Sequence, residues 1–364
     1  MVLRVGPLEV DPPVVLAPMA GVTTPAFRRL CRHYGAGLYV SEMVSARGLV
    51  GRDERTWRLA RPAADERPRS VQLSGTDAAV VGAAVRLLVD ELGVEHVDLN
   101  MGCPTRKVTR HGGGAALPWK SDRFAAVVGA AVGAAGAVPV TVKMRIGIDD
   151  AHRTHLDAGR VAAEAGVAAV ALHARTAAQW YSGRADWAAI GALREHVAGV
   201  PVLGNGDVFA GADAVAMIRR TGCDGVVIGR GCLGRPWLFR DLADALAGRS
   251  VRPAPALGEV AAVIAEHAGL LAAAEGEARA CRALRRHLPW YLLGYPVAPP
   301  VRDALARVGS LADLDRLIRG LDPGARPAPD EADGPRGPVQ GPQPVALPDQ
   351  WLSSRSLPAD PARE

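Results

Sequence analysis

The chain has 364 residues, of which 49% are hydrophobic and 22% are charged, and its formal net charge at pH 7 is +5. This length exceeds one average domain, and the composition excludes a wholly disordered chain, a collagen-like fibre and a coiled coil. Five cysteines without paired spacing exclude a disulfide scaffold and predict a cytoplasmic protein. The sequence holds no Cys/His cluster, so we predict no bound metal.

Two segments bear on membrane association. Residues 1–10 carry Arg4 and Glu9 and lack a long apolar core, so we expect no signal peptide. Residues 124–142 carry no charge over 19 residues, which is long enough for a membrane span. Because this stretch is rich in alanine and glycine and is divided by Pro139, we predict a buried helix followed by a buried strand.

Up to about residue 245 the chain repeats one unit, a short aliphatic run followed by a polar turn and a helical stretch. The runs are apolar on both faces, as strands of a helix-covered parallel sheet are. Residues 78–91 and 155–165 are two of the predicted helices. The eight predicted strands are Val14–Ala17, Leu38–Ser41, Ser70–Leu73, His96–Leu99, Val140–Lys143, Ala169–Leu172, Val202–Gly204 and Gly225–Ile228.

Eight such units predict a (β/α)8 barrel over residues 1–245, since this fold takes about 250 residues. The competing α/β architecture is a doubly wound open sheet, which needs a glycine-rich turn after its first strand. Here that turn reads Ala17-Pro18-Met19-Ala20-Gly21, which is a poor phosphate loop.

Beyond Arg240 the strand pattern ends. Apolar residues at helical spacing in 260–271 and 304–318 predict a small all-α domain over residues 246–322. Residues 323–364 hold 10 of the 28 prolines and carry a net charge of −2, so we predict a disordered tail there. The remaining chain is basic, which favours a polyanionic partner.

In a (β/α)8 barrel the chemistry lies at the C-terminal ends of the strands. Nearly every predicted strand is followed there by a polar or otherwise special residue, which a purely structural barrel does not need. These residues are Pro18 and Met19, Glu42, Gln72, Asn100, Lys143, His173, Asn205, and the pair Gly229 and Arg230.

The turns after the last two strands predict a phosphate site. They read Gly204-Asn205-Gly206-Asp207 and Gly229-Arg230-Gly231. Their glycines let backbone N–H groups approach an anion, and Arg230 can add a charge-assisted hydrogen bond. Barrels of this kind commonly bind phosphate at these two loops. The alternative is a pair of ordinary glycine turns.

Lys143 ends an otherwise apolar strand, where burying a lysine is costly unless it meets an anion or a polar cavity. We interpret it as facing an electron-rich cofactor or a carbonyl group; the alternative is a strand-end lysine whose amine reaches solvent. Gln72 follows the third strand, where its amide can pair with the edge of a heterocycle or act as a simple cap.

Cys103 lies in the segment Asp98-Leu99-Asn100-Met101-Gly102-Cys103-Pro104, in a Gly–Pro turn just past the fourth strand. A thiol held rigidly there can act as nucleophile, general acid or redox centre. No second cysteine lies nearby in the sequence, which argues against a disulfide. The alternative is a buried thiol without a chemical role.

Two groups of cations are candidates for a polyanionic substrate. Arg106, Lys107 and Arg110 follow Cys103 directly on its loop. Arg279, Arg282 and Arg286 share one face of a predicted helix, at i, i+3 and i+7. Each group indicates either contact with nucleic acid or a solvated basic surface.

Taken together, these residues resemble the tRNA-dihydrouridine synthases, flavin-dependent reductases of uridine in tRNA, and the bacterial B-type subgroup most of all. Asn-x-Gly-Cys-Pro is the most specific element, whereas Ala174 and the long 112–114 glycine run depart from the family pattern. The matching segments, within residues 5–320, are 17–23, 41–43, 71–73, 98–104, 142–145, 172–176, 204–207 and 228–230.

The resemblance implies FMN across the barrel mouth, NADPH as reductant and tRNA as substrate. It implies hydride transfer from flavin N5 to uracil C6, with Cys103 protonating C5 as general acid. The target uridine would leave the tRNA stack to react. The implied cofactor-binding residues are Pro18, Met19, Ala20, Gln72, Lys143, His173, Asn205, Gly206, Asp207, Gly229 and Arg230. The implied substrate-binding residues are Asn100, Arg175, Arg106, Lys107, Arg110, Arg279, Arg282 and Arg286.

Two other functions remain open at this stage. One is an FMN oxidoreductase like dihydroorotate dehydrogenase, which acts on a free pyrimidine; the basic loop at 106–110 and the basic helical domain argue against it. The other is a tRNA-binding protein without catalysis, against which bound FMN would count. We expect a monomer without a membrane partner.

Overall fold

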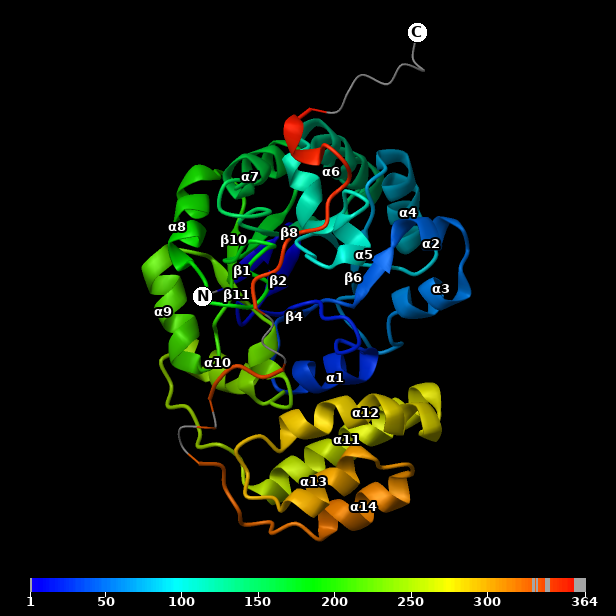
Figure 1. Cartoon of the computed structure of the whole chain (residues 1–364), viewed down its shortest axis with the longest axis vertical. Helices are drawn as coiled ribbons and strands as arrows, with labels where there is room; N and C mark the ends of the chain where they lie inside the picture. The colour runs from blue at the N-terminus through cyan, green and yellow to red at the C-terminus, as the bar shows by residue number, and fades with distance from the viewer. Residues whose placement is uncertain (1, 329–330, 332, 338–340, 357–364) are drawn as a thin grey trace.

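The computed structural model describes residues 2–328, 331, 333–337 and 341–356. Its centre is a nine-stranded parallel sheet in the order β4-β3-β11-β10-β9-β8-β7-β6-β5 (Figure 1). The strands are β3 (Val14–Leu16), β4 (Leu38–Tyr39), β5 (Met43–Ser45), β6 (Ser70–Ser74), β7 (His96–Met101), β8 (Val140–Arg145), β9 (Ala169–His173), β10 (Val202–Asn205) and β11 (Gly225–Ile228).

The sheet closes through its two end strands, β4 and β5, which are consecutive in the chain. Between them, the Val40 N–H group donates to Leu16 O on β3 at 3.3 Å, and the Ser41 N–H group donates to Ser70 O on β6 at 3.1 Å. β4 and β5 are therefore two parts of one barrel strand. The predicted (β/α)8 barrel is confirmed, with the predicted strand at 38–41 broken in its middle.

The barrel helices bury one apolar side against the sheet. In α4 this side consists of Val81, Ala84, Val85 and Leu88, at helical spacing, and the Asp77 carboxylate accepts the Val80 N–H group at 2.9 Å to cap the first turn. The helices of the barrel are α1 (Pro25–His33), α2 (Ala46–Val50), α3 (Glu54–Ala60), α4 (Ala78–Asp90), α5 (Arg106–Thr109), α6 (Ser121–Ala135), α7 (His155–Glu164), α8 (Trp187–His196), α9 (Gly211–Thr221) and α10 (Leu238–Leu246).

The predictions for helices at 78–91 and 155–165 are confirmed by α4 and α7. The uncharged stretch 124–142 lies in α6 and the start of β8, so the prediction of a buried helix followed by a buried strand is also correct. Among the described residues, one helix, Leu257–Glu275, has the length and apolar composition of a membrane span. It packs within a helical bundle, against its neighbouring helices and α1.

An antiparallel hairpin of β1 (Leu3–Val5) and β2 (Leu8–Val10) closes the N-terminal end of the barrel. Leu3, Val5 and Val10 pack there against side chains inside the barrel, such as Leu203 and Ala169. We did not predict this hairpin, because each of its strands has only three residues.

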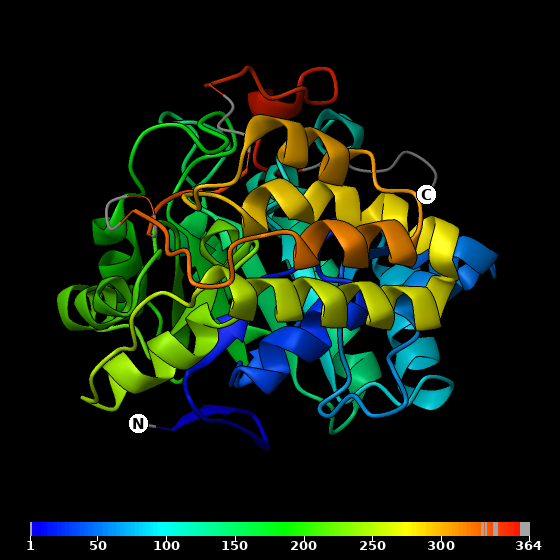
Figure 2. The same ribbon diagram turned by 90° about the horizontal axis from the view of Figure 1, so that it is seen from below.

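The helical part consists of α11 (Leu257–Glu275), α12 (Glu277–Tyr291), α13 (Pro299–Ala306) and α14 (Leu311–Arg319), with α11 lying against α1 (Figures 1 and 2). The helical spacing predicted over 304–318 does not form one continuous helix but belongs to α13 and α14. Residues 307–310 break it, and the Ser310 hydroxyl accepts the Asp313 N–H group at 3.1 Å to start α14. A serine at an N-cap favours a new helix over continuing the old one.

The prediction of a disordered tail over 323–364 is wrong for much of its described part. Trp351, in the short helix η3 (Trp351–Ser353), is only 7% exposed, and it packs against Ala116 and Ile148 of the barrel. Backbone and ion-pair contacts, which the composition does not reveal, hold this segment in place. Residues 329–330, 332, 338–340 and 357–364, to which the same prediction applied, lie outside the described residues.

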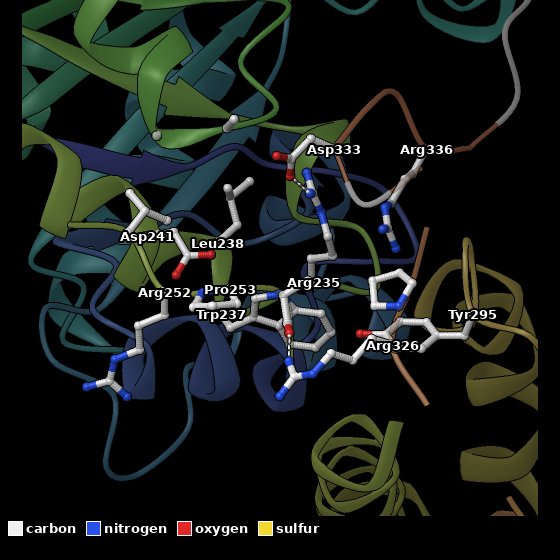
Figure 3. Close-up of a pocket in the computed structure, with 15 residues that line it drawn as sticks. Arg235, Trp237, Leu238, Asp241, Arg252, Pro253, Tyr295, Arg326, Asp333 and Arg336 are labelled. Carbon is white, nitrogen blue, oxygen red and sulfur yellow. Dashed lines mark hydrogen bonds and ion pairs between the residues drawn. The ribbon is translucent and has the colours of Figure 1, made fainter. Parts of the chain in front are cut away.

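The described residues Arg326, Pro327, Asp333 and Arg336 lie at the junction between the barrel and the helical part. A cavity of about 390 Å³ lies there, and in it Arg235 faces Asp333 at 2.5 Å (Figure 3). Tyr295 and Arg326 line its other side. None of the predicted site residues lines this cavity.

A buried ion pair joins α1 to the loop before β6. The guanidinium of Arg28 donates to both carboxylate oxygens of Glu66, with the Nη2–Oε2 distance 2.6 Å, and to Thr23 O at 2.8 Å. The side chains of Arg28 and Glu66 are 3% and 5% exposed. Losing either partner would leave a buried charge uncompensated.

We therefore predict that Glu66→Ala lowers the free energy of unfolding by about 3–5 kcal/mol. The matched control is Glu9→Ala, which removes the partner of Arg4 from a pair whose side chains are 61% and 74% exposed. It should change stability by less than about 1 kcal/mol. Chemical denaturation of both variants gives the two values. Equal losses of unfolding free energy in the two variants would show that the buried Arg28–Glu66 pair contributes no more to stability than an exposed pair.

Candidate active site

The mouth of the barrel holds a polar pocket at the C-terminal ends of the strands. The loops after β3, β9, β10 and β11 form its walls, and Lys143 of β8 points into it. The predicted site residues that line it are Pro18, Met19, Lys143, His173, Arg175, Asn205, Gly206, Asp207, Gly229 and Arg230. Ala20 lies exposed beside Met19, outside this lining.

A chain of side-chain hydrogen bonds runs across the neighbouring strands to Cys103. Gln72 Nε2 on β6 donates to Asp98 Oδ2 on β7 at 2.7 Å, and Asn100 Nδ2 donates to Gln72 Oε1 at 2.8 Å. Asn100 Oδ1 in turn accepts the Cys103 N–H group at 2.9 Å. Asp98, Gln72 and Asn100 thereby hold the turn that carries the thiol.

Cys103 is partly exposed, whereas the other four cysteines are buried. Its Sγ lies 3.1 Å from Thr105 Oγ1, and Arg145 Nε donates to Gly102 O at 2.9 Å. The thiol is therefore partly open to solvent, outside the lining of the pocket, while its backbone is held from both sides. This arrangement suits a residue that delivers a proton.

Lys143 is partly buried, and its ammonium group donates to Asn205 Oδ1 at 3.0 Å. Asn205 is fixed in turn by its Nδ2 donating to Val227 O at 2.7 Å. Burial, together with the nearby Arg145, lowers the pKa of Lys143 to about 8, and Asp98 limits the shift. An anion in the pocket would favour the charged amine.

Arg175, Arg230 and His173 surround one end of the pocket. Arg175 Nη2 contacts both oxygens of Asp207 at 2.8 Å, and the Arg230 guanidinium lies 4.3 Å from the ring centre of Tyr181. Burial, together with nearby cations, lowers the pKa of His173 well below its usual value and also lowers the pKa of Arg230. His173 is therefore a neutral imidazole beside guanidinium groups.

Within the described residues, three buried nitrogens of this end have no hydrogen-bond partner: His173 Nε2, Arg175 Nη1 and Arg230 Nη1. Unsatisfied buried polar atoms are costly, and three around one pocket indicate that a bound group satisfies them. At Gly206 a Cβ would lie 2.8 Å from the Ala185 side chain and near His173 and Arg175, so the loop leaves the space clear. These donors fit a phosphate group.

Of the predicted substrate cations, Arg175 lines this pocket, whereas the two basic groups on the Cys103 loop and on α12 lie outside its lining. Arg106, Lys107 and Arg110 are exposed on or next to α5, directly after Cys103. Arg279 and Arg282 are exposed on α12. The third predicted residue of that helix behaves differently, as described next.

Arg286 connects α12 to the loop after β3, since its Nη1 donates to Gly21 O at 2.9 Å. On the other side of that loop, the Gly21 N–H group donates to Glu42 Oε2 at 2.5 Å. Arg286 is thus a link between the helical part and the pocket wall as well as a surface cation. Helical spacing alone could not distinguish it from Arg279 and Arg282.

Sequence reasoning missed three residues of the site: Asp98, Arg145 and Tyr181. Asp98 and Arg145 lie two residues from Asn100 and Lys143 on the same strands, so strand alternation points them to the same side. That signal was present in the sequence. Tyr181 lies in the long loop after β9, where no periodicity indicates direction.

The barrel is closed, and its mouth carries unsatisfied cationic donors and an accessible thiol. These features define the class of protein as a (β/α)8-barrel enzyme. Within that class the chain belongs to the dihydrouridine synthase family, whose model matches residues 15–319. The predicted family resemblance is confirmed. The matched range includes the helical part and, with it, α12.

Named relatives agree with this assignment. A "probable tRNA-dihydrouridine synthase" of Mycobacterium tuberculosis is 54% identical over 96% of this chain and 92% of its own length. That match necessarily extends into residues 323–364. A "tRNA-dihydrouridine synthase B" of Pseudomonas putida is 39% identical over 85% of this chain and 90% of its own.

Solved structures support the fold. Histamine dehydrogenase from Rhizobium sp. 4-9 has a TM-score of 0.54 at 14% identity, over 74% of this chain and 50% of its own length. An amine oxidase from Pseudomonas geniculata, acting on 6-hydroxypseudooxynicotine, has a TM-score of 0.51 at 14% identity, over 72% and 52%. This chain spans about half the length of each, and at 14% identity the likeness concerns the fold alone.

The buried Asp98 leads to a prediction about pH. Burial raises the pKa of Asp98 to about 6 from an ordinary 3.8, while its Gln72 and Thr141 donors and Lys143 limit the rise. Between these two values the folded protein keeps a proton that the unfolded chain has released, so folding stability falls as the pH rises through them. Asp98→Asn removes this dependence.

From about pH 4 to about pH 7 the unfolding free energy of the parent protein should therefore fall relative to Asp98→Asn, by something on the order of 1–3 kcal/mol. Urea titrations of both proteins across this range measure the difference. A difference that stays constant with pH would mean that Asp98 is not the titrating group.

Proposed function

We propose that this protein is an FMN-dependent tRNA-dihydrouridine synthase that reduces uridines of tRNA to 5,6-dihydrouridine, with NADPH as reductant. The observation that carries the proposal is the set of three unsatisfied donors, His173 Nε2, Arg175 Nη1 and Arg230 Nη1, at the mouth of a barrel of this family. The printed names of the relatives supply the substrate class.

FMN fits the residues at the mouth. Arg175, Arg230 and the open backbone at Gly206 would hold its phosphate, and Pro18 and Met19 would line the ring. Lys143 would stay charged beside an electron-rich ring and stabilise negative charge that develops on it. When bound, the flavin supplies the hydride that is added to uracil C6.

Cys103 would supply the proton that completes the reduction at uracil C5. Its thiol is the accessible one, and the bond from its N–H group to Asn100 fixes the turn. Hydride at C6 and a proton at C5 together saturate the double bond, so no other reactant is needed. The thiolate left behind regains a proton from solvent.

The tRNA would lie over the mouth and the helical part. Arg106, Lys107 and Arg110 border the thiol, and Arg279 and Arg282 extend the basic surface along α12. Phosphate contacts of this kind position a nucleic acid without reading its sequence. A uridine must also leave the base stack to reach the pocket. A free pyrimidine would need neither group of cations.

The role of Cys103 is tested by Cys103→Ala. FMN content and NADPH-driven flavin reduction should stay near normal, because the thiol acts only on uridine. Flavin reoxidation by tRNA should slow by about 10²–10⁴-fold, the usual effect of losing a positioned acid–base group. Stopped-flow traces separate the two half-reactions. In cells lacking the gene, the parent gene should restore dihydrouridine in tRNA and the variant gene should not.

Cys103→Ser is the matched variant, since a hydroxyl can relay a proton but is a poorer acid, and it should keep a small part of the activity. If Cys103→Ala slows both half-reactions alike, or loses FMN, the thiol is a packing group. Unchanged reoxidation by tRNA would remove it as the proton donor.

The role of α12 is tested by the double variant Arg279→Ala/Arg282→Ala. It should weaken tRNA binding and make the slope of log K against log salt shallower by about 1.5, for two lost phosphate contacts. FMN content should not change. We leave Arg286 intact because it also holds the pocket loop.

The matched control for α12 is Arg316→Ala/Arg319→Ala, which removes the same charge from α14, where both side chains are more than 70% exposed. Filter binding or fluorescence titration at several salt concentrations compares the two. The same loss in both double variants would mean that only net charge matters and that α12 is not a specific contact.

A further inference from the structure

Residues 341–356, which we call the C-terminal strap, cross the mouth side of the barrel. The Gln343 N–H group donates to Ala178 O in the loop after β9 at 2.9 Å, and Trp351 packs on Ile148 and Ala116 in the loops after β8 and β7. Figure 1 shows this orange-to-red segment in front of the barrel, ending near α6. In Figure 2 it lies at the end opposite the N-terminal hairpin.

Trp351 is the most deeply seated residue of the strap. Its Nε1 donates to Ala116 O at 3.1 Å, and the ammonium of Lys120 lies 5.3 Å from its ring centre. The ring also lies on Gly112, where a Cβ would come within 2.5 Å of it. The strap therefore contacts the segment 112–120 through the indole N–H group, a cation and the ring edge.

This segment is the second half of the loop that carries Cys103. Ala115, next to the residue that Trp351 binds, donates its N–H group to Cys103 O at 3.1 Å. At Gly114 a Cβ would lie 2.5 Å from Cys103 O, so the backbone passes directly beside the cysteine. Two hydrogen bonds through adjacent residues thus connect the Trp351 indole to the Cys103 backbone.

The strap is held beyond Trp351 as well. Lys120 Nζ donates to Ser354 O at 2.5 Å, and the Ser121 N–H group donates to Arg355 O at 3.2 Å. Arg355 in turn forms an ion pair with Asp157 of α7 at 2.6 Å. Ordering a chain segment is entropically costly, and these contacts offset that cost at the end of the Cys103 loop and on α7.

We propose that the C-terminal strap holds the Cys103 loop in its reactive position, with Trp351 as the positioning residue. The proposal rests on the proposed role of Cys103 as proton donor. Asn100 fixes the loop at its start, and Trp351 fixes it at its far end. A thiol that must deliver a proton to one carbon atom of the substrate needs both attachments of its loop, because a misplacement of about 1 Å can lower the rate by as much as 10²-fold.

The test compares Trp351→Ala with Trp57→Ala in the full-length, FMN-loaded protein. Trp57 of α3 is a close chemical match, since its Nε1 donates to Leu49 O at 2.9 Å and Arg52 lies 4.7 Å from its ring centre. Trp351→Ala should slow flavin reoxidation by tRNA by about 10- to 100-fold, with NADPH-driven reduction unchanged. Trp57→Ala should leave both half-reactions near normal.

A second measurement reports on the loop without tRNA. Iodoacetamide should label Cys103 in preference to the other four thiols, because those four are buried. The labelling rate therefore reports on the exposure of Cys103. Trp351→Ala should raise this rate severalfold, and Trp57→Ala should not. Trp351→Phe keeps the ring over Gly112 but loses the indole N–H bond, so it should fall between the parent protein and Trp351→Ala in both measurements.

The proposal is overturned if Trp351→Ala reoxidises with tRNA at the parent rate, or if both tryptophan variants change labelling alike. If Trp351→Ala loses FMN, the proposal is judged on Trp351→Phe instead. Parent-like reoxidation and parent-like labelling in Trp351→Phe would then count against the indole hydrogen bond. Failure of the Cys103 role is separate, because it would appear as normal reoxidation in Cys103→Ala. In that case changed labelling in Trp351→Ala would still show that the strap fixes the loop.

Discussion

The geometry of the mouth depends on the direction in which one chain of hydrogen bonds runs. The Asp98 carboxylate only accepts, so the amide nitrogen of Gln72 must turn toward it and the amide oxygen of Gln72 must turn away. That oxygen orients Asn100, whose own oxygen is then left for the Cys103 N–H group. A single buried charge thus sets the orientation of two amides and of the turn that carries the thiol.

The same mouth concentrates positive charge. Burial is the main cause that lowers the pKa of Lys143 to about 8 and that of Arg145 to about 10. Nearby guanidinium groups add to both shifts, Arg145 to that of Lys143, and Arg175 and Arg230 to that of Arg145. Asp207 neutralises part of this charge by pairing with Arg175, but Arg230 is 4.0 Å from it and stacks on Tyr181. The folded protein therefore holds cations whose mutual repulsion a bound anion would relieve.

Much of the active site could be predicted from the sequence, because a parallel barrel places the C-terminal ends of all its strands at the same end. Lys143 and His173 could be assigned to the mouth from their places after aliphatic runs, with no knowledge of the distances between them. The features that were missed depend on contacts between distant segments. At 307–310 the Ser310 N-cap starts a new helix although the helical spacing of apolar residues continues. The bond from Arg286 to Gly21 depends on how the helical part packs against the barrel. The strap is ordered by backbone hydrogen bonds, which a proline-rich composition does not reveal.

Gly112 and Trp351 are far apart in the sequence, yet the conformation of one depends on the presence of the other. The backbone at Gly112 has a φ of +72°, and any side chain there would enter the tryptophan ring. Gly112 therefore leaves room for the strap, whereas Gly113 and Gly114 leave room for Val108 and for the backbone of Cys103. We therefore expect a glycine at the position of Gly112 in the cysteine loop and a C-terminal extension bearing an aromatic residue to be gained or lost together in evolution. Exchanging one without the other would leave an unmatched surface beside the thiol.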